Sequence, residues 1–202
     1  MEQVILVDDN DEMTGIGEKM WTHLQGKLHR AFSVFVFDRA GQLLLQKRAE
    51  TKYHSSNLWS NTCCGHPRPG ESIESAAHRR LQEEMGFDCR LQEIFTFTYK
   101  VEFDSNLSEH EYDHVLRGVF DGEPSPNVRE VSDWTWMDVD TLMNDIASCP
   151  DRYTYWLRLA IGRVHALRPS TNFAGVPDAV GGLPSNAESP TGLSHGEDRE
   201  GE

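Results

Sequence analysis

The sequence predicts a mixed fold of the α+β or α/β class, in which a β-sheet sandwich is flanked by helices. The first observation is a nearly continuous apolar run at residues 31–37 (AFSVFVF), which is typical of a strand buried on both faces. The second is a stretch of helical spacing in the middle of the chain, at residues 72–85. The third is the return of strand patterns after that stretch, with two helical stretches near the end.

The strands are predicted from apolar patterns in the sequence and from the turn residues between them. Residues 4–7 are predicted to form a short strand, and the turn at residues 38–41 joins the apolar run 31–37 to a hairpin partner at residues 43–47. Later strands are predicted at residues 92–103, 110–120 and 131–137.

The helices follow from spacing and from the residues at their ends. Glu71 and Glu74 suit the positive end of the helix dipole at the start of residues 72–85, and Gly86 suits its end. The apolar positions of that helix are Ile73, Ala76, Ala77, Leu81 and Met85. A further helix is predicted to begin near Asp138, and a last one covers residues 151–167 after Pro150.

A change of composition near Pro169 predicts the domain organisation. Residues 169–202 contain 4 Pro, 6 Gly, 4 Ser and 6 acidic residues, but only one basic residue, Arg199. Such a segment buries too little apolar surface to offset its ordering entropy. We therefore expect one folded catalytic domain over residues 1–168 and a disordered acidic tail over residues 169–202.

The charge balance excludes some classes of partner. The chain carries 33 acidic and 19 basic residues, a formal net charge of −14. Nucleic acids and anionic membranes attract basic surfaces, so we expect neither as a partner. A small anionic substrate is still compatible, because a local basic cluster or a bound cation can reverse the field within one pocket.

The sequence also predicts a cytoplasmic protein with free thiols. It contains no apolar stretch of about 18 residues, and its first residues are acidic, unlike a signal peptide. An adjacent pair of cysteines with two distant single ones does not form a disulfide framework. The four are Cys63, Cys64, Cys89 and Cys149.

The most informative motif spans residues 65–87. Gly65 is followed at the same spacing as in the Nudix box by Glu71, Arg79, Leu81, Glu83, Glu84, Gly86 and Phe87. The segment resembles that box, in which carboxylates on a loop–helix–loop gather a hard cation that bridges to diphosphate oxygens. Arg80 departs from the pattern, because the box has Glu at that position. The replacement of a metal-binding acid by a cation weakens the interpretation as a hydrolase.

The residues around this motif resemble one family within that superfamily, the type I isopentenyl-diphosphate delta-isomerases. The resemblance covers roughly residues 2–165. It is carried by Gly17-Glu18-Lys19, His23, the segment 28–33 (LHRAFS), the segment 46–49 (QKRA), the segment 59–67 (WSNTCCGHP), Glu109-His110-Glu111 and Tyr155-Trp156. It implies a Nudix-like mixed sheet sandwich and the interconversion of isopentenyl and dimethylallyl diphosphate, a step of isoprenoid precursor biosynthesis. The implied isomerase needs divalent metal and no flavin.

A metal site is predicted from three histidines and two glutamates. His23, His29 and His66 can supply imidazole nitrogens, and Glu109 and Glu111, two residues apart on a strand, project from the same face. Such a nitrogen and oxygen ligand set favours Mn²⁺, Mg²⁺ or Zn²⁺. The resemblance further implies that Glu84 binds a Mg²⁺ ion that arrives with the diphosphate.

The resemblance assigns the remaining roles. Cys64 and Glu111 are the expected proton-transfer residues, Tyr99 assists Glu111, and Trp156 faces the carbocation. The expected diphosphate-binding residues are Lys19, Arg48, Lys52 and Arg80. The order in which Cys64 and Glu111 act depends on the direction of the reaction, and the sequence leaves it open.

Two other functions fit part of the sequence. A Nudix hydrolase acting on a nucleoside diphosphate derivative shares the fold, but Arg80 counts against it and it has no use for Cys64 and Glu111. A noncatalytic module that senses an isoprenoid or nucleotide diphosphate is the second alternative. The complete set of proton-transfer candidates counts against that one.

Overall fold

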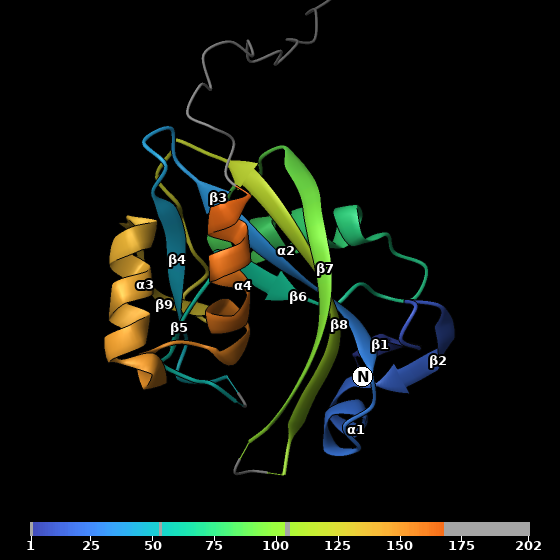
Figure 1. Cartoon of the computed structure of the whole chain (residues 1–202). Helices are drawn as coiled ribbons and strands as arrows, with labels where there is room; N and C mark the ends of the chain where they lie inside the picture. Colours follow the sequence, from blue (N-terminus) through green and yellow to red (C-terminus); the bar gives the residue numbers. More distant parts are fainter. Residues whose placement is uncertain (1, 53, 104–105, 168–202) are drawn as a thin grey trace, which may run out of the picture. The chain divides into compact units, whose positions relative to one another are not determined.

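The structure, a computed structural model, describes residues 2–52, 54–103 and 106–167 (Figure 1). The chain divides into a unit of Met1–Thr171 and a second unit of Asn172–Glu202, and all the described residues belong to the first. The predicted tail, residues 169–202, lies outside the described residues, so the predicted domain organisation stays a prediction. No helix in the described part of the chain is both long and apolar enough to cross a membrane.

Along the described chain the longer strands and helices follow the order that the sequence predicts. The strands are β1 (Gln3–Val7), β2 (Met13–Glu18), β3 (His29–Phe37), β4 (Leu43–Arg48), β5 (Trp59–Ser60), β6 (Cys63–Gly65), β7 (Leu91–Glu102), β8 (Ser108–Val119) and β9 (Val131–Met137). The helices are α1 (Lys19–Leu24), α2 (Ile73–Met85), α3 (Val139–Ser148) and α4 (Tyr155–Ala166), with a 3₁₀ turn at Pro150–Arg152. The short elements β2, α1, β5 and β6 were not predicted.

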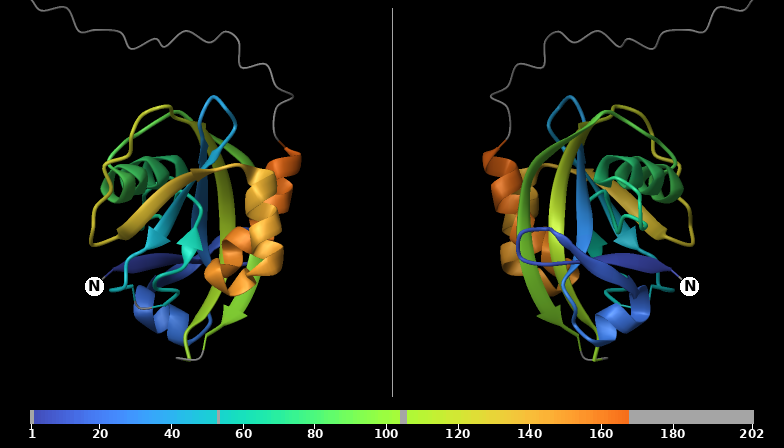
Figure 2. Two further views of the ribbon diagram at one scale, coloured as in Figure 1. Left: turned by 90° about the vertical axis from the view of Figure 1, so that its left-hand side faces the viewer. Right: turned by 90° about the vertical axis from the view of Figure 1, so that its right-hand side faces the viewer.

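Strand β3 organises the sheet, as its uninterrupted apolar sequence predicts. It runs parallel to β8 over its whole length, and it pairs antiparallel with β1, β4 and β6. Alternate side chains of β3 enter different cores. Phe32 and Val34 pack with Leu81 of α2, whereas Phe35 and Phe37 pack with residues of α3 and α4. Figure 2 shows α2 on one side of the sheet and α3 and α4 on the other, which confirms the predicted fold class.

The ends of α2 agree with the sequence prediction. The Ser72 side chain accepts a hydrogen bond from the backbone N–H of Ser75 and so caps the start of the helix. Gly86 ends it in the left-handed conformation, with φ of 74°. A Cβ atom there would lie 2.2 Å from the carbonyl oxygen of Ser125, so the position requires glycine.

The prediction of a last helix over residues 151–167 is wrong about where the helix starts. Pro150 begins only a 3₁₀ turn, the chain is extended at Tyr153 and Thr154, and α4 starts at Tyr155. The backbone N–H of Thr154 donates to the carbonyl of Trp59 (2.9 Å), and the Tyr153 hydroxyl bonds to Asp145. These contacts with α3 and with β5 hold the two residues out of the helix.

Candidate active site

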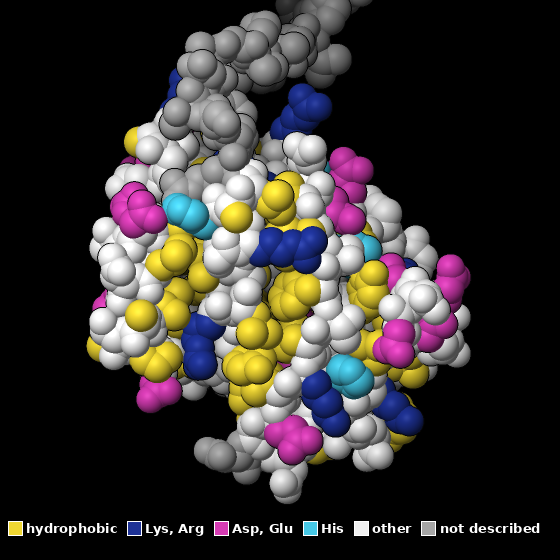
Figure 3. Space-filling model, viewed as in Figure 1, with side chains coloured by type: hydrophobic (Ala, Val, Ile, Leu, Met, Phe, Trp, Pro, Cys, Tyr) yellow, Lys and Arg dark blue, Asp and Glu magenta, His cyan; other side chains and the backbone are white. Residues whose placement is uncertain are grey.

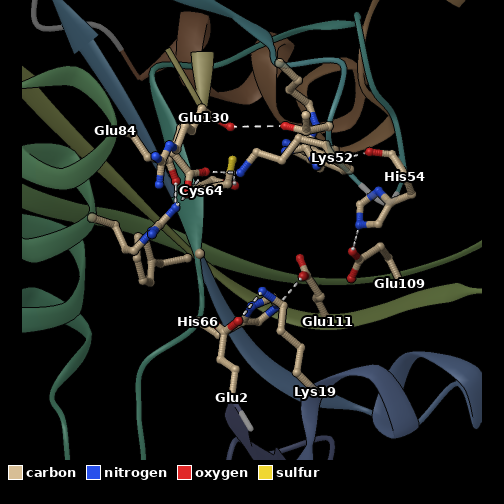
Figure 4. A pocket seen from close by; sticks show the side chains of 18 of the residues that line it. Glu2, Lys19, Lys52, His54, Cys64, His66, Glu84, Glu109, Glu111 and Glu130 are labelled. Carbon is tan, nitrogen blue, oxygen red and sulfur yellow. Dashed lines mark hydrogen bonds and ion pairs between the residues drawn. The ribbon is translucent and has the colours of Figure 1, made fainter. Parts of the chain in front are cut away.

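One cavity of about 320 Å³ brings together most of the predicted site residues. It is lined by side chains from α1, β3, β4, β6, α2, β7, β8 and α4, so segments from both ends of the first unit contribute to it. Figure 4 shows His66, Glu109 and Glu111 toward one end of this pocket and Lys52, Glu84 and Glu130 toward the other. His23 and His29 are fully buried next to it.

The predicted metal ligands form a compact cluster. One donor atom from each of His23, His29, His66 and Glu109 lies within 4.8 Å of the others. Glu111 Oε1 joins them at 2.9 Å from His66 Nε2 and 3.8 Å from His29 Nε2. Glu109 and Glu111 lie on the same face of β8, as expected for residues two apart on a strand.

Backbone carbonyls orient two of the imidazoles. Nδ1 of His23 lies 2.6 Å from the carbonyl oxygen of Lys19, and Nδ1 of His29 lies 2.9 Å from that of Lys27. A carbonyl only accepts hydrogen bonds, so Nδ1 carries the hydrogen in both rings. Nε2 therefore faces the cluster, which is the arrangement that supports metal-ligating histidines.

The burial of the cluster changes the pKa values of its members. Burial lowers the pKa of His29 to about 4 and that of His66 well below its ordinary value. Burial raises the pKa of Glu111, and the neighbouring Glu109 raises it further. The pKa of Glu109 is lowered in spite of burial, because His23 and His54 bond to its carboxylate. Neutral His29 and His66 thus have lone pairs available at neutral pH.

The metal-free protein should lose stability as the pH falls from about 6.5 towards 4. The pKa of His29 is near 6.5 in an unfolded chain but about 4 in the fold, so between these values the unfolded chain binds more protons. The stability is therefore complete above pH 6.5 and decreases on acidification, by up to about 1.4 kcal/mol per pH unit. Urea unfolding of EDTA-treated protein at pH 7 and pH 5 checks this against the His29→Gln variant. The same pH dependence in both proteins would contradict the prediction.

Cys64 faces the pocket, whereas its neighbour Cys63 is fully buried in the core beneath α2. Cys64 Sγ lies 3.2 Å from the Asn61 side-chain oxygen and 3.7 Å from the Ser33 hydroxyl. The Asn61 amide donates to the carbonyls of Val34 and Cys63, which fixes its oxygen toward the thiol. Burial, with the nearby Asp113, raises the pKa of Cys64 to about 12. The thiol is therefore protonated.

Tyr99 and Glu111 form a hydrogen-bonded pair across two neighbouring strands. They stand opposite each other in the antiparallel register of β7 and β8. The Tyr99 hydroxyl donates to Glu111 Oε2 at 2.6 Å, and Glu111 Oε1 faces the histidines. One carboxylate thus joins the tyrosine to the metal-ligand cluster.

Trp156 supplies an aromatic wall of the pocket. Its indole N–H donates to the Ser60 hydroxyl at 3.1 Å. The Arg48 guanidinium carbon lies 5.3 Å from the centre of its ring, within the range of a cation–π contact. A π-face that accepts a cation on one residue is suited to stabilising positive charge on a ligand.

Three of the four predicted diphosphate-binding cations are paired with carboxylates. Lys19 lies 3.2 Å from Glu2, Lys52 pairs with Glu130, and Arg80 pairs with Glu84 and Glu130. Among the described residues, the pocket lining holds five Lys or Arg side chains and five Glu side chains. On the face seen in Figure 3, basic and acidic side chains are interspersed. The four predicted diphosphate-binding cations come from α1, β4, the segment after β4 and α2, and folding brings them into one pocket.

Comparisons with known proteins identify the family. The sequence matches the NUDIX domain family over residues 27–157. It is 51% identical to isopentenyl-diphosphate delta-isomerase 2 of Aromatoleum aromaticum, in an alignment that covers 86% of this chain and 92% of the relative. It is 54% identical to an isopentenyl-diphosphate delta-isomerase 2 of Photorhabdus laumondii, over 79% and 90% of the two chains. The chain belongs to the isopentenyl-diphosphate delta-isomerase family.

Solved structures place this isomerase family member in the same fold as more distant proteins. The crystal structure of DR0079 from Deinococcus radiodurans superposes with a TM-score of 0.67 at 22% identity, over 80% of this chain and 98% of that one. The MutT protein from Methanosarcina mazei superposes with a TM-score of 0.57 at 15% identity, over 69% and 94%. At these identities the likeness concerns the fold alone, and it confirms the Nudix-like architecture.

Several pocket residues of this isomerase family member were not predicted. Ser33 and Asp113 lie behind Cys64, and the Ser33 hydroxyl donates to Asp113 at 2.7 Å. Asp113 lies two residues after Glu111 on β8, so the alternation of the strand already places its side chain on the same face of the sheet as Glu109 and Glu111. Glu130 and His54 come from segments outside the strands and helices, and nothing in their sequence pattern indicates the pocket.

Proposed function

We propose that the protein interconverts isopentenyl diphosphate and dimethylallyl diphosphate, by metal-dependent protonation and deprotonation through a tertiary carbocation. The observation that carries the proposal is the pocket itself. A thiol, a carboxylate hydrogen-bonded to a tyrosine, and an indole face line one cavity together with five Lys or Arg side chains. The names of relatives at about 50% identity support the same reaction.

The donor set fits a divalent cation. We assign His23, His29, His66, Glu109 and Glu111 to one ion, either Mn²⁺, Mg²⁺ or Zn²⁺, because the cluster offers three imidazoles and two carboxylates. When bound, the ion supplies positive charge that polarises the Glu111 carboxyl group and neutralises part of the charge of the cluster. We assign a second ion, Mg²⁺, to Glu84 and the diphosphate oxygens.

The reaction requires one proton to be added and another to be removed two carbons away. Protonation of the terminal alkene carbon leaves the positive charge on the tertiary carbon, and loss of a proton from the carbon next to it, toward the diphosphate, forms the new double bond. Cys64 and Glu111 are the two groups that exchange these protons, and their roles reverse with the direction of the reaction. Tyr99 holds the Glu111 carboxyl group by its hydrogen bond.

The remaining pocket residues hold the substrate and protect the intermediate. Lys19, Arg48, Lys52 and Arg80 bind the diphosphate through charge-assisted hydrogen bonds. The indole face of Trp156 attracts the carbocation by about 0.5 to 2 kcal/mol. The buried indole of Trp156 also shields the cation from water on the side of the pocket that it forms.

The test is to supply isopentenyl diphosphate with Mg²⁺ and Mn²⁺ in D₂O and follow the products by NMR. The proposal expects dimethylallyl diphosphate, with deuterium from solvent incorporated at the carbon that receives the proton. Release of a monophosphate or of inorganic phosphate instead would favour a Nudix hydrolase. Saturable binding without any product would favour a noncatalytic diphosphate-binding module.

A further inference from the structure

A fourth histidine, His54, lies next to the metal-ligand cluster but is not part of it. It belongs to the segment between β4 and β5, two residues after Lys52, and its side chain is 5% exposed. Its Nε2 lies 2.7 Å from Glu109 Oε1. The other oxygen of the same carboxylate, Oε2, lies 3.2 Å from His23 Nε2 and 3.8 Å from His29 Nε2. The two oxygens of Glu109 therefore have different partners.

The imidazole of His54 is held on several sides. It stacks on Phe103, with ring centres 4.9 Å apart and planes at 14°, and it meets Trp156 edge-on at 6.0 Å. Its Nδ1 lies 3.2 Å from the Ser55 hydroxyl, which can donate to it. A carboxylate oxygen only accepts hydrogen bonds, so Nε2 carries the hydrogen and points it at Glu109 (Figure 4).

The same residue is connected to the cation that is assigned to the diphosphate. The Arg48 guanidinium donates to the backbone carbonyl of His54 at 3.2 Å and to that of Ser55 at 3.1 Å. Arg48 also lies against the Trp156 ring. His54 thus stands between the metal-ligand cluster, the aromatic wall and one of the diphosphate-binding residues.

We propose that His54 is a positioning residue for the metal site: by donating to Glu109 Oε1, it holds the carboxylate so that Oε2 faces the histidines. The inference rests on the proposed metal site of the isomerase. A carboxylate without this hydrogen bond can rotate about its terminal torsion or offer both oxygens to the ion. Hydrogen-bond partners of this kind change metal affinity by about 10- to 100-fold when they are removed.

The experiment compares four variants of the full chain with the wild type, one of them His29→Ala as a control for the metal site. The dissociation constant of Co²⁺ is measured by chelator competition in the absence of substrate, and the visible spectrum of bound Co²⁺ reports the ligand geometry. His54→Ala should weaken Co²⁺ binding by about 10- to 100-fold and change the spectrum. His54→Gln should restore most of the affinity, because its amide N–H can donate to Glu109. Phe103→Leu removes the ring that stacks on His54 but keeps the hydrogen bond, so it should bind Co²⁺ like the wild type.

Two results would overturn the inference while leaving the proposed function intact. The first is an affinity of His54→Ala within about twofold of the wild type, when His29→Ala loses Co²⁺ binding. The second is a Phe103→Leu variant that is as weak as His54→Ala, because the loss would then come from packing. If His29→Ala bound Co²⁺ as tightly as the wild type, the result would contradict the proposed metal site, and with it the inference about His54. Urea unfolding of each variant shows whether it is folded at the temperature of the titration.

Discussion

Replacing Cys64 with alanine should lower turnover by at least about 10²- to 10⁴-fold, the usual range for a group that transfers a proton in the transition state. Substrate binding should survive, because the variant leaves unchanged the proposed metal sites and the proposed diphosphate-binding residues, Lys19, Arg48, Lys52 and Arg80. The thiol lines the pocket, and its Sγ lies near the Asn61 side-chain oxygen and the Ser33 hydroxyl, so we expect its removal to leave the fold in place. Steady-state kinetics with isopentenyl diphosphate, together with a direct binding measurement, separates the two effects.

Cys63→Ala is the matched control for this experiment. It makes the same change one position away, but Cys63 is fully buried in the core beneath α2 and does not line the pocket. Its replacement should reduce the free energy of unfolding through lost packing and leave turnover nearly unchanged. Equal losses of turnover in both variants, or a fully active Cys64→Ala enzyme, would remove Cys64 from the mechanism.

Glu111→Gln should also lower turnover by about 10²- to 10⁴-fold, and it should weaken metal binding as well. The carboxylate is expected to exchange a proton with the substrate and to bind the ion, and an amide performs neither task well. The variant keeps the size of the side chain, so its stability should stay close to that of the wild type. Turnover, metal content after dialysis and urea unfolding together check the three expectations.

Tyr99→Phe is a milder change at the same hydrogen bond and serves as the comparison for Glu111→Gln. It removes the hydroxyl that donates to Glu111 Oε2 at 2.6 Å but leaves Glu111 in place. Turnover should therefore fall by less than in Glu111→Gln, and metal binding should be retained. A Tyr99→Phe enzyme that is slower than Glu111→Gln would show that the tyrosine, and not the glutamate, exchanges the proton.

The parts of the fold that the sequence predicts are those with long, regular patterns. The run at residues 31–37 indicates burial on both faces, and β3 packs against α2 on one side and α3 and α4 on the other. The short elements were not predicted. Helix α1 has six residues, which is too few for a recognisable apolar period. Its first turn is capped by the Glu18 side chain, and the helix contacts β1 and β2. The predicted start of the last helix was wrong because the contacts of Thr154 with Trp59 and of Tyr153 with Asp145 override the helix preference after Pro150.

The candidate site was predictable where a motif or a strand alternation marks it. The shared face of Glu109 and Glu111 follows from their spacing on a strand, and the roles of Cys64, His66 and Glu84 were expected from the resemblance to the isomerase family. His54 could not be predicted in this way, because its partner Glu109 is 55 positions further along the sequence in another element. Only the folded chain brings such residues together.

The equal number of cations and carboxylates around the pocket has a thermodynamic consequence. Because three of these cations, Lys19, Lys52 and Arg80, are already paired with carboxylates, divalent cations that enter with a diphosphate neutralise much of the negative charge that it brings. Metal and substrate are then reciprocal effectors: the factor by which the ion tightens substrate binding equals the factor by which the substrate tightens ion binding. The half-saturating concentration of substrate is therefore not a constant of the protein, and it decreases as the free concentration of divalent cation rises.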